Sequence, residues 1–96
     1  MTGPSFGRRA AAAPGARMRP DGFFRTDQEQ RDLDHAFAAT FSPENPASIR
    51  VLDYIEAITV RRVISPEASA DALRHQEGMR GLYALIRGAI DRGRAG

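Results

Sequence analysis

The sequence predicts an all-α protein, a small bundle of about three helices preceded by a disordered basic N-terminal arm. Apolar residues recur at intervals of three and four in three segments between residues 26 and 92, as on one face of a helix. Each of these segments begins at a residue type that caps helices, and prolines lie in both connections between them. No segment alternates clearly between apolar and polar residues, although the run RVLDYIEAITVRRVI has enough β-branched residues to form a strand in another context.

Residues 1–25 are rich in Arg, Ala, Gly and Pro, and we expect them to form the disordered arm. This composition offers too little apolar surface to offset the entropy of ordering, so the first 20 or so residues should be dispensable for folding. Residues 1–20 carry four arginines and no acid, a charge of +4, whereas residues 21–96 carry ten arginines against twelve acids, a charge of −2. The candidate nucleic-acid contacts are therefore in the arm: Arg8, Arg9, Arg17 and Arg19. Contacts of this kind would be weak, independent of sequence and sensitive to salt, and a solvated leader without a partner is the simpler interpretation.

The first helix should begin after Thr26. Thr26 and Glu29 have the spacing of a capping box, in which each side chain accepts a hydrogen bond from the other residue's backbone. Leu33, Phe37 and Phe41 follow at four-residue spacing and are expected to form its buried stripe. Pro43 should end the helix, because a proline disfavours helical geometry at the residue before it.

The second helix is expected from Pro46 to about Val63. Asn45 can cap it, and Pro46 can occupy the first helical position without the loss of a needed hydrogen bond. Its apolar residues are Ile49, Leu52, Ile55 and Ile58 or Thr59, with Val51 and Tyr54 widening the stripe. After Ser65, either a helix begins at Pro66 or a loop continues until Ser69 caps the next helix, and we expect a short turn there.

The third helix should run from about Ala70 to Asp91, with Ser69 as a possible cap and Gly93 ending it. Its apolar face comprises Leu73, Met79, Leu82, Tyr83, Ile86 and Ile90. The stretch HQEGMR near its start contains a glycine, which costs about 0.5 to 1 kcal/mol inside a helix. We therefore expect Gly78 to permit close approach of another helix, and Glu77 and Arg80, three residues apart, to form an ion pair.

The residue types that most enzymes use are scarce. The chain has no cysteine, which excludes disulfides, thiolate metal sites and thiol nucleophiles. Its two histidines, His35 and His75, are not in a metal-binding arrangement, and the carboxylates Asp53 and Glu56 are expected on a solvated helix face. No apolar run near the start is long enough to cross a bilayer. We therefore expect no catalytic residue, no metal and no cofactor in an intracellular protein.

Two parts of the chain, LDHAFAATFSPENPASIRVLDYIEAITV and LRHQEGMRGLYALIRGAI, resemble the small phage protein family known as Bbp19-like. The resemblance covers about Leu33 to Ile90 and rests on the order and spacing of short motifs. The matching positions are Phe37, Phe41, Pro43, Val51, Leu52, Thr59, Glu77, Gly78, Met79 and Arg80. One departure is the turn after Pro43, where the family usually has a glycine and this chain has Asn45.

The resemblance implies a helical domain at residues 26–92 of a non-enzymatic phage or prophage protein, or of a protein from a gene-transfer particle. Its partners would be other virion or phage structural proteins, without a cofactor, a membrane or a small-molecule substrate. We would expect it in the bacterial cytoplasm, and it could be incorporated in the virion. The alternative is a small helical regulatory protein, or one that associates with DNA nonspecifically through the arm. A helix-turn-helix reader is disfavoured, because the helix after Ser65 would present Glu67, Asp71 and Glu77 to phosphates.

Overall fold

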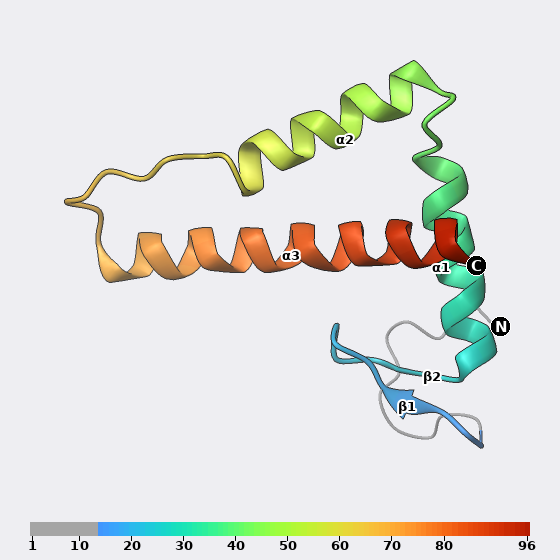
Figure 1. Ribbon diagram of the computed structural model, residues 1–96. Helices are drawn as coiled ribbons and strands as arrows, with labels where there is room; N and C mark the ends of the chain where they lie inside the picture. The colour runs from blue at the N-terminus through green and yellow to red at the C-terminus, as the bar shows by residue number, and fades with distance from the viewer. Residues whose placement is uncertain (1–13) are drawn as a thin grey trace, which may run out of the picture.

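The computed structural model describes residues 14–96 as a short β-hairpin followed by three helices (Figure 1). The elements in chain order are β1 (Arg17–Met18), β2 (Phe24–Arg25), α1 (Asp27–Thr40), α2 (Pro46–Thr59) and α3 (Ala70–Ala95). The prediction of an all-α class with three helices is confirmed.

Helix α1 begins and ends where local signals predict. Thr26 Oγ1 accepts a hydrogen bond from the Glu29 N–H at 3.1 Å, and Glu29 Oε1 accepts one from the Thr26 N–H at 2.8 Å. These two bonds satisfy donors that the first turn of a helix would otherwise leave unpaired. The helix ends at Thr40, with Phe41 as its C-cap, ahead of Pro43. The predicted capping box is therefore confirmed.

The starts of α2 and α3 are also as predicted. Asn45 Oδ1 accepts a hydrogen bond from the Ala47 N–H at 3.1 Å, and Pro46 occupies the first helical position. Ser69 Oγ accepts one from the Ala72 N–H at 3.1 Å and caps α3. All three helices thus begin at side chains that supply the missing acceptors.

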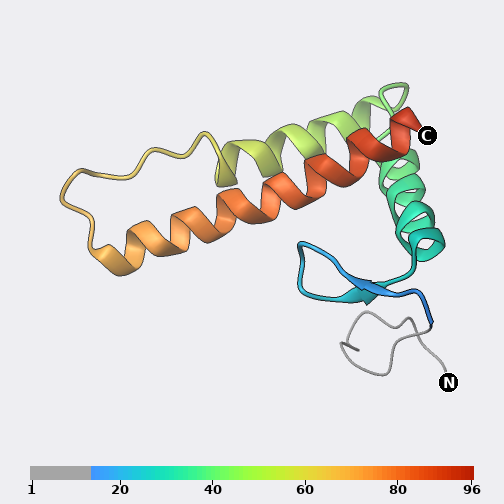
Figure 2. The same ribbon diagram turned by 60° about the horizontal axis from the view of Figure 1, so that its bottom comes forward.

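The three helices enclose only a small core. Helices α2 and α3 run side by side in opposite directions, and α1 lies across the C-terminal turns of α3, with the hairpin below (Figures 1 and 2). The radius of gyration is 15.9 Å, whereas a compact domain of 100 residues has about 13 Å. The buried apolar residues of the described chain are Leu52 in α2 and Ala89 and Ile90 in α3. Much of the apolar surface on α2 and α3 consequently stays exposed.

Residues 14–25, expected within the disordered arm, instead include the β-hairpin. Strands β1 and β2 pair antiparallel with Met18 opposite Phe24, and Gly22 in the connecting turn has a φ of 94°. Such a positive φ suits glycine because it has no Cβ. The strands are two residues long and show no alternation, so a pattern of period two could not reveal them. We therefore no longer expect residues 14–25 to be dispensable for folding. Arg8 and Arg9 lie outside the described residues.

Helix α2 ends at Thr59, four residues earlier than the predicted Val63. Thr59 Oγ1 donates a hydrogen bond to the Ile55 carbonyl oxygen at 2.7 Å, and the Gln76 side-chain amide of α3 donates one to the Thr59 carbonyl. The Thr59 carbonyl is thereby paired with α3 at the point where the helix stops. The connection to α3 is residues 60–69. The predicted turn is present within it, closed by a hydrogen bond from the Ala68 N–H to the Ser65 carbonyl oxygen at 2.9 Å, and the loop continues to the cap at Ser69.

Helix α3 extends to Ala95, and Gly93 lies inside it rather than ending it. A Cβ at position 93 would lie 2.1 Å from the carbonyl oxygen of Asp34 and 2.7 Å from Cβ of Ala38, both in α1. A Cβ at Gly78 would meet nothing within 4 Å. The predicted close approach at Gly78 was therefore wrong, and Gly93 is the glycine at the helix crossing. Gly93 follows Ile90 by three residues on the buried side of α3, whereas Gly78 is exposed.

The two glycines should respond oppositely to the same substitution. Gly93→Ala places a methyl group against the α1 backbone, so it should destabilise the protein by about 1 to 3 kcal/mol or more through overpacking. Gly78→Ala adds a methyl group in open space and should stabilise it by about 0.5 to 1 kcal/mol through helix propensity. Urea denaturation of both variants measures the two effects. Equal effects on the free energy of unfolding would contradict the assigned crossing point.

Candidate functional site

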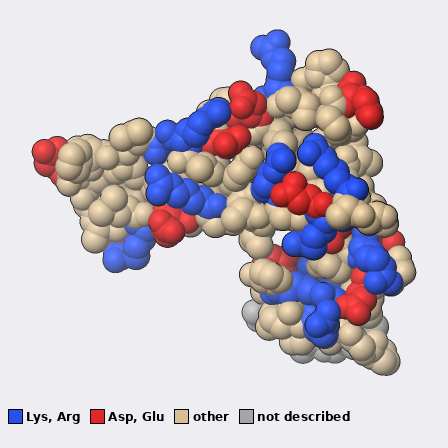
Figure 3. Space-filling model, viewed as in Figure 1, with Lys and Arg blue, Asp and Glu red and all other residues tan. Residues whose placement is uncertain are grey.

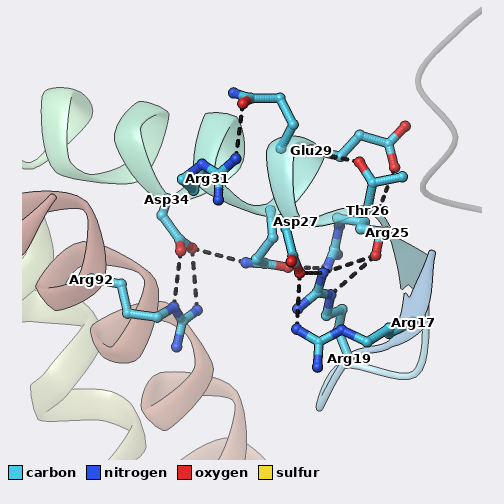
Figure 4. A network of polar contacts seen from close by, with 11 residues as sticks. Arg17, Arg19, Arg25, Thr26, Asp27, Glu29, Arg31, Asp34 and Arg92 are labelled. Atoms are coloured by element: carbon cyan, nitrogen blue, oxygen red, sulfur yellow. Dashed lines mark hydrogen bonds and ion pairs between the residues drawn. The ribbon is translucent and has the colours of Figure 1, made fainter. Parts of the chain in front are cut away.

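The most buried carboxylate of the described chain is Asp34 on α1, whose side chain is 7% exposed. It accepts hydrogen bonds from Arg92 Nε at 2.9 Å, from Arg92 Nη2 at 3.2 Å and from Gln30 Nε2 at 2.8 Å (Figure 4). The bonds to Asp34 raise the pKa of Arg92 above its ordinary value. Because Arg92 comes from α3, this bidentate ion pair joins two helices through residues that are 58 positions apart in the chain.

The contacts of Asp34 continue into the hairpin. Gln30 Oε1 accepts a hydrogen bond from Arg25 Nη1 at 2.8 Å, and Arg25 Nη2 pairs with the Asp21 carboxylate. Burial opposes the ionisation of Asp21, but its hydrogen bonds to Arg25 and to the Phe23 N–H outweigh burial and lower its pKa. We call the residues Asp21, Arg25, Gln30, Asp34 and Arg92 the Asp34 network. It connects the hairpin, α1 and α3.

Two of the predicted nucleic-acid contacts, Arg17 and Arg19, pair with an acid of the protein itself. Both donate to Asp27 Oδ1, Arg17 from Nη2 at 2.8 Å and Arg19 from Nη2 at 2.9 Å. Arg19 also donates to the Arg25 carbonyl oxygen at 2.9 Å, and its side chain is 13% exposed. The hydrogen bonds from Arg19 and Arg17 lower the pKa of Asp27. A phosphate would have to compete with this carboxylate for both arginines.

The described residues carry as many acids as arginines. Removing Arg8 and Arg9 from the total of 14 arginines leaves 12 in residues 14–96, against 12 acids in the same range. On the face seen in Figure 3, basic and acidic side chains are interspersed along the helices. Nucleic-acid-binding surfaces usually gather arginines and lysines on one side, and the face in Figure 3 lacks that electrostatic pattern.

A groove of about 400 Å³ lies in the corner between the hairpin, α1 and α3, and we call it the corner groove. Residues of the Asp34 network, together with Arg19, contribute its polar side. Leu82 and Leu85 of α3 lie in it, with 54% and 39% of their surface exposed. The apolar lining is completed by Pro20, Leu33, Phe37, Ala84, Ile86 and Ala89. The groove thus combines an accessible apolar surface with arginines that pair with acids of the protein itself.

The structure separates the residues of the family motif. Phe37 lines the corner groove, Leu52 is buried in α2, and Pro43 is exposed in the turn after α1. Phe41 is half-buried, and its carbonyl oxygen accepts a hydrogen bond from Arg94 Nη2 at 2.9 Å. These positions do not converge on one site.

The motif HQEGMR lies on another part of α3. Glu77 and Arg80 line a second groove of about 420 Å³ beneath residues 60–64, and Gly78 is exposed beside them. The ion pairs within α3 are Asp71 with Arg74 and Arg87 with Asp91. The predicted pair of Glu77 with Arg80 is not formed in the described structure, so that prediction was wrong.

The sequence patterns did not predict that the polar residues Asp34 and Gln76 are buried. Asp34 follows Leu33 and precedes Phe37 by three residues, and Gln76 precedes Met79 by three, so both polar side chains fall within apolar stripes. A polar residue at a buried helical position is a signal for a paired group. This signal could have pointed to Asp34, but it could not have identified Arg92 as its partner.

Within residues 14–96, no three His, Asp or Glu side chains gather in a way that could hold a metal ion. None of the helices in this range combines the length and apolar character needed to span a bilayer. No family model, curated protein or solved structure matches the chain. The interpretation of the site therefore depends on its geometry and on the sequence motifs.

Loss of the charge on Asp34 should destabilise the fold. Asp34→Asn retains the shape but removes the anion that Arg92 and Gln30 face, at a cost of about 1 to 3 kcal/mol in the free energy of unfolding. The control Asp91→Asn removes an acid from an exposed pair with Arg87 and should cost no more than about 0.5 kcal/mol. Urea denaturation at neutral pH compares the two. Similar costs for both would mean that the Asp34 pair contributes no more than a surface ion pair.

Proposed function

We propose that this chain is a non-enzymatic phage or prophage protein, or one of a gene-transfer particle, that binds another structural protein through the corner groove. The observation that carries the proposal is the exposed apolar lining of that groove. Its border includes three arginines, Arg19, Arg25 and Arg92, that pair with acids of the protein. The resemblance of the sequence to Bbp19-like phage proteins supports the assignment to a particle. The partner that fits is a segment with apolar side chains and at least one carboxylate.

The apolar content of the groove favours a macromolecular partner. Leu82 and Leu85 line the groove with exposed side chains, and Leu33 and Phe37 of α1 line it as well. Contiguous exposed apolar surface that is bordered by polar residues often marks a site of protein binding. Arg92 is 56% exposed even though it pairs with Asp34, so its guanidinium stays accessible to a partner's acid.

The state of Asp34 supports a binding role over a catalytic one. A general base needs a free lone pair directed at its substrate. Asp34 instead accepts three hydrogen bonds from Arg92 and Gln30 and is nearly buried. Asp34 joins α1 to α3 through its ion pair with Arg92, and no nucleophile lies among its hydrogen-bond partners.

The alternative function is nonspecific association with DNA through the arm. Arg17 and Arg19 are paired with Asp27, which leaves Arg8 and Arg9 as the arginines that the alternative needs most. Two contacts of this kind would give weak binding that falls steeply with salt. The corner groove has no role in this alternative, so a groove variant separates the two functions.

The proposal predicts that the protein copurifies with particles and that Leu85→Lys reduces its incorporation. A lysine at position 85 introduces a charge into the apolar part of the groove, and we expect incorporation to fall at least about tenfold. Quantitative mass spectrometry of particles purified from the induced host gives the ratio of this protein to the capsid protein. The control Asp71→Asn alters an exposed pair far from the groove and should leave the ratio unchanged.

Absence of the protein from purified particles would contradict the assignment to a particle. Normal incorporation of a folded Leu85→Lys variant would contradict the role of the corner groove. Incorporation that depends on packaged DNA and is lost in high salt would instead favour the alternative, because ionic contacts to phosphates weaken steeply with salt.

A further inference from the structure

Helix α2 carries a second apolar stripe that the fold leaves uncovered. Ala47, Val51, Tyr54 and Ile58 follow one another at intervals of four, three and four residues, the spacing of core positions in a coiled coil. Ala47 is exposed, and Val51, Tyr54 and Ile58 are 52%, 64% and 37% exposed. The helix faces α3 with other residues, since Leu52 and Thr59 are buried and the Thr59 carbonyl bonds Gln76.

Opposite charges flank this stripe just beyond the two ends of α2. Glu44 lies in the turn three residues before Ala47, and Arg61 lies in the connection three residues after Ile58. Glu44 Oε1 accepts a hydrogen bond from Ser42 Oγ at 2.9 Å. Arg61 Nη2 donates to the carbonyl oxygen and to Oδ1 of Asp53 at 3.2 and 3.4 Å, with its side chain 51% exposed. We call Glu44, Ala47, Val51, Tyr54, Ile58 and Arg61 the α2 seam.

We propose that the α2 seam binds the α2 seam of a second copy in antiparallel orientation, forming a two-fold symmetric dimer. In this register each residue faces a complementary one of the other chain. Glu44 faces Arg61, Ala47 faces Ile58, and Val51 faces Tyr54, and each pair occurs twice because of the symmetry. A small side chain meets a large one and an acid meets a base, so one surface is complementary to itself.

The parallel alternative lacks this complementarity. It would place Glu44 against Glu44 and Arg61 against Arg61, and like charges at facing positions destabilise an interface. It would also set Ala47 against Ala47 and Tyr54 against Tyr54, which leaves one layer underfilled and crowds another. The positions of the charges and of the small residue therefore select the antiparallel pairing.

The dimer should be weak. Helix α2 has 14 residues and is about 21 Å long, so the seam is shorter than most stable interfaces require. None of the seam residues lines the corner groove. Self-association therefore goes beyond the proposed function, and either one can fail without the other.

Sedimentation equilibrium of the full chain tests the dimer and its orientation. Wild-type protein should associate with a dissociation constant of about 10 μM to 1 mM, as expected of a small interface. Ala47→Glu and Ile58→Lys each place an unpaired charge against an apolar residue, and each should weaken the dimer at least about tenfold. The double variant should recover most of this loss, because antiparallel pairing brings the introduced carboxylate of one copy against the introduced ammonium group of the other.

Circular dichroism and urea denaturation confirm that each variant is folded, and Leu85→Lys in the corner groove is the matched control. We expect that control to dimerise like the wild type. A monomer throughout the concentration range would overturn the proposal, and so would a double variant that associates no better than the single ones. Loss of the dimer in Leu85→Lys alone would assign self-association to α3 and would also overturn it.

Discussion

The arrangement of this protein depends on the burial of one charge, the carboxylate of Asp34. An anion removed from water is costly unless it is paired and hydrogen-bonded, and Arg92 and Gln30 together provide three donors. The Asp34 backbone is equally constrained, since α3 approaches its carbonyl so closely that only a glycine fits at position 93. Side chain and backbone of one residue thus determine where α1 crosses α3. Through Gln30 and Arg25 the same contacts position the hairpin.

This constraint explains why the molecule has grooves and exposed apolar faces. With Leu52, Ala89 and Ile90 as the buried apolar residues of the described chain, the core is too small to cover the antiparallel pair of α2 and α3. The Asp34 network keeps α1 across one end of this helix pair, and the corner groove results. The rest of α2 and α3 extends away from the junction, as Figure 2 shows, and its outer residues remain available for contact. Both proposed interactions use surface that a more compact packing would have buried.

The features that could be predicted from the sequence are local ones. The caps at Thr26, Asn45 and Ser69 depend on neighbouring residues only, and each helix begins where they indicate. Helix ends were less predictable, because Thr59 bonds a side chain from α3 and α3 continues through Gly93 against α1. The hairpin was missed since its strands are short and its arginines obtain partners only after folding. Of the groove residues, Phe37 was expected in a buried stripe and Arg19 as a nucleic-acid contact, whereas Asp34 and Arg92 of the adjoining network required the long-range contact to be known.

A double-mutant cycle between Arg25 and Arg92 tests the central claim most directly. Arg25 donates to Gln30, Gln30 donates to Asp34, and Asp34 accepts from Arg92, so the network links the two arginines across different elements. If the network acts as one unit, the free-energy costs of Arg25→Gln and Arg92→Gln should be non-additive by at least about 0.5 kcal/mol. The double variant should cost less than the sum of the single ones. Additivity within about 0.3 kcal/mol would mean that the hairpin and α3 are held independently, and it would contradict the account.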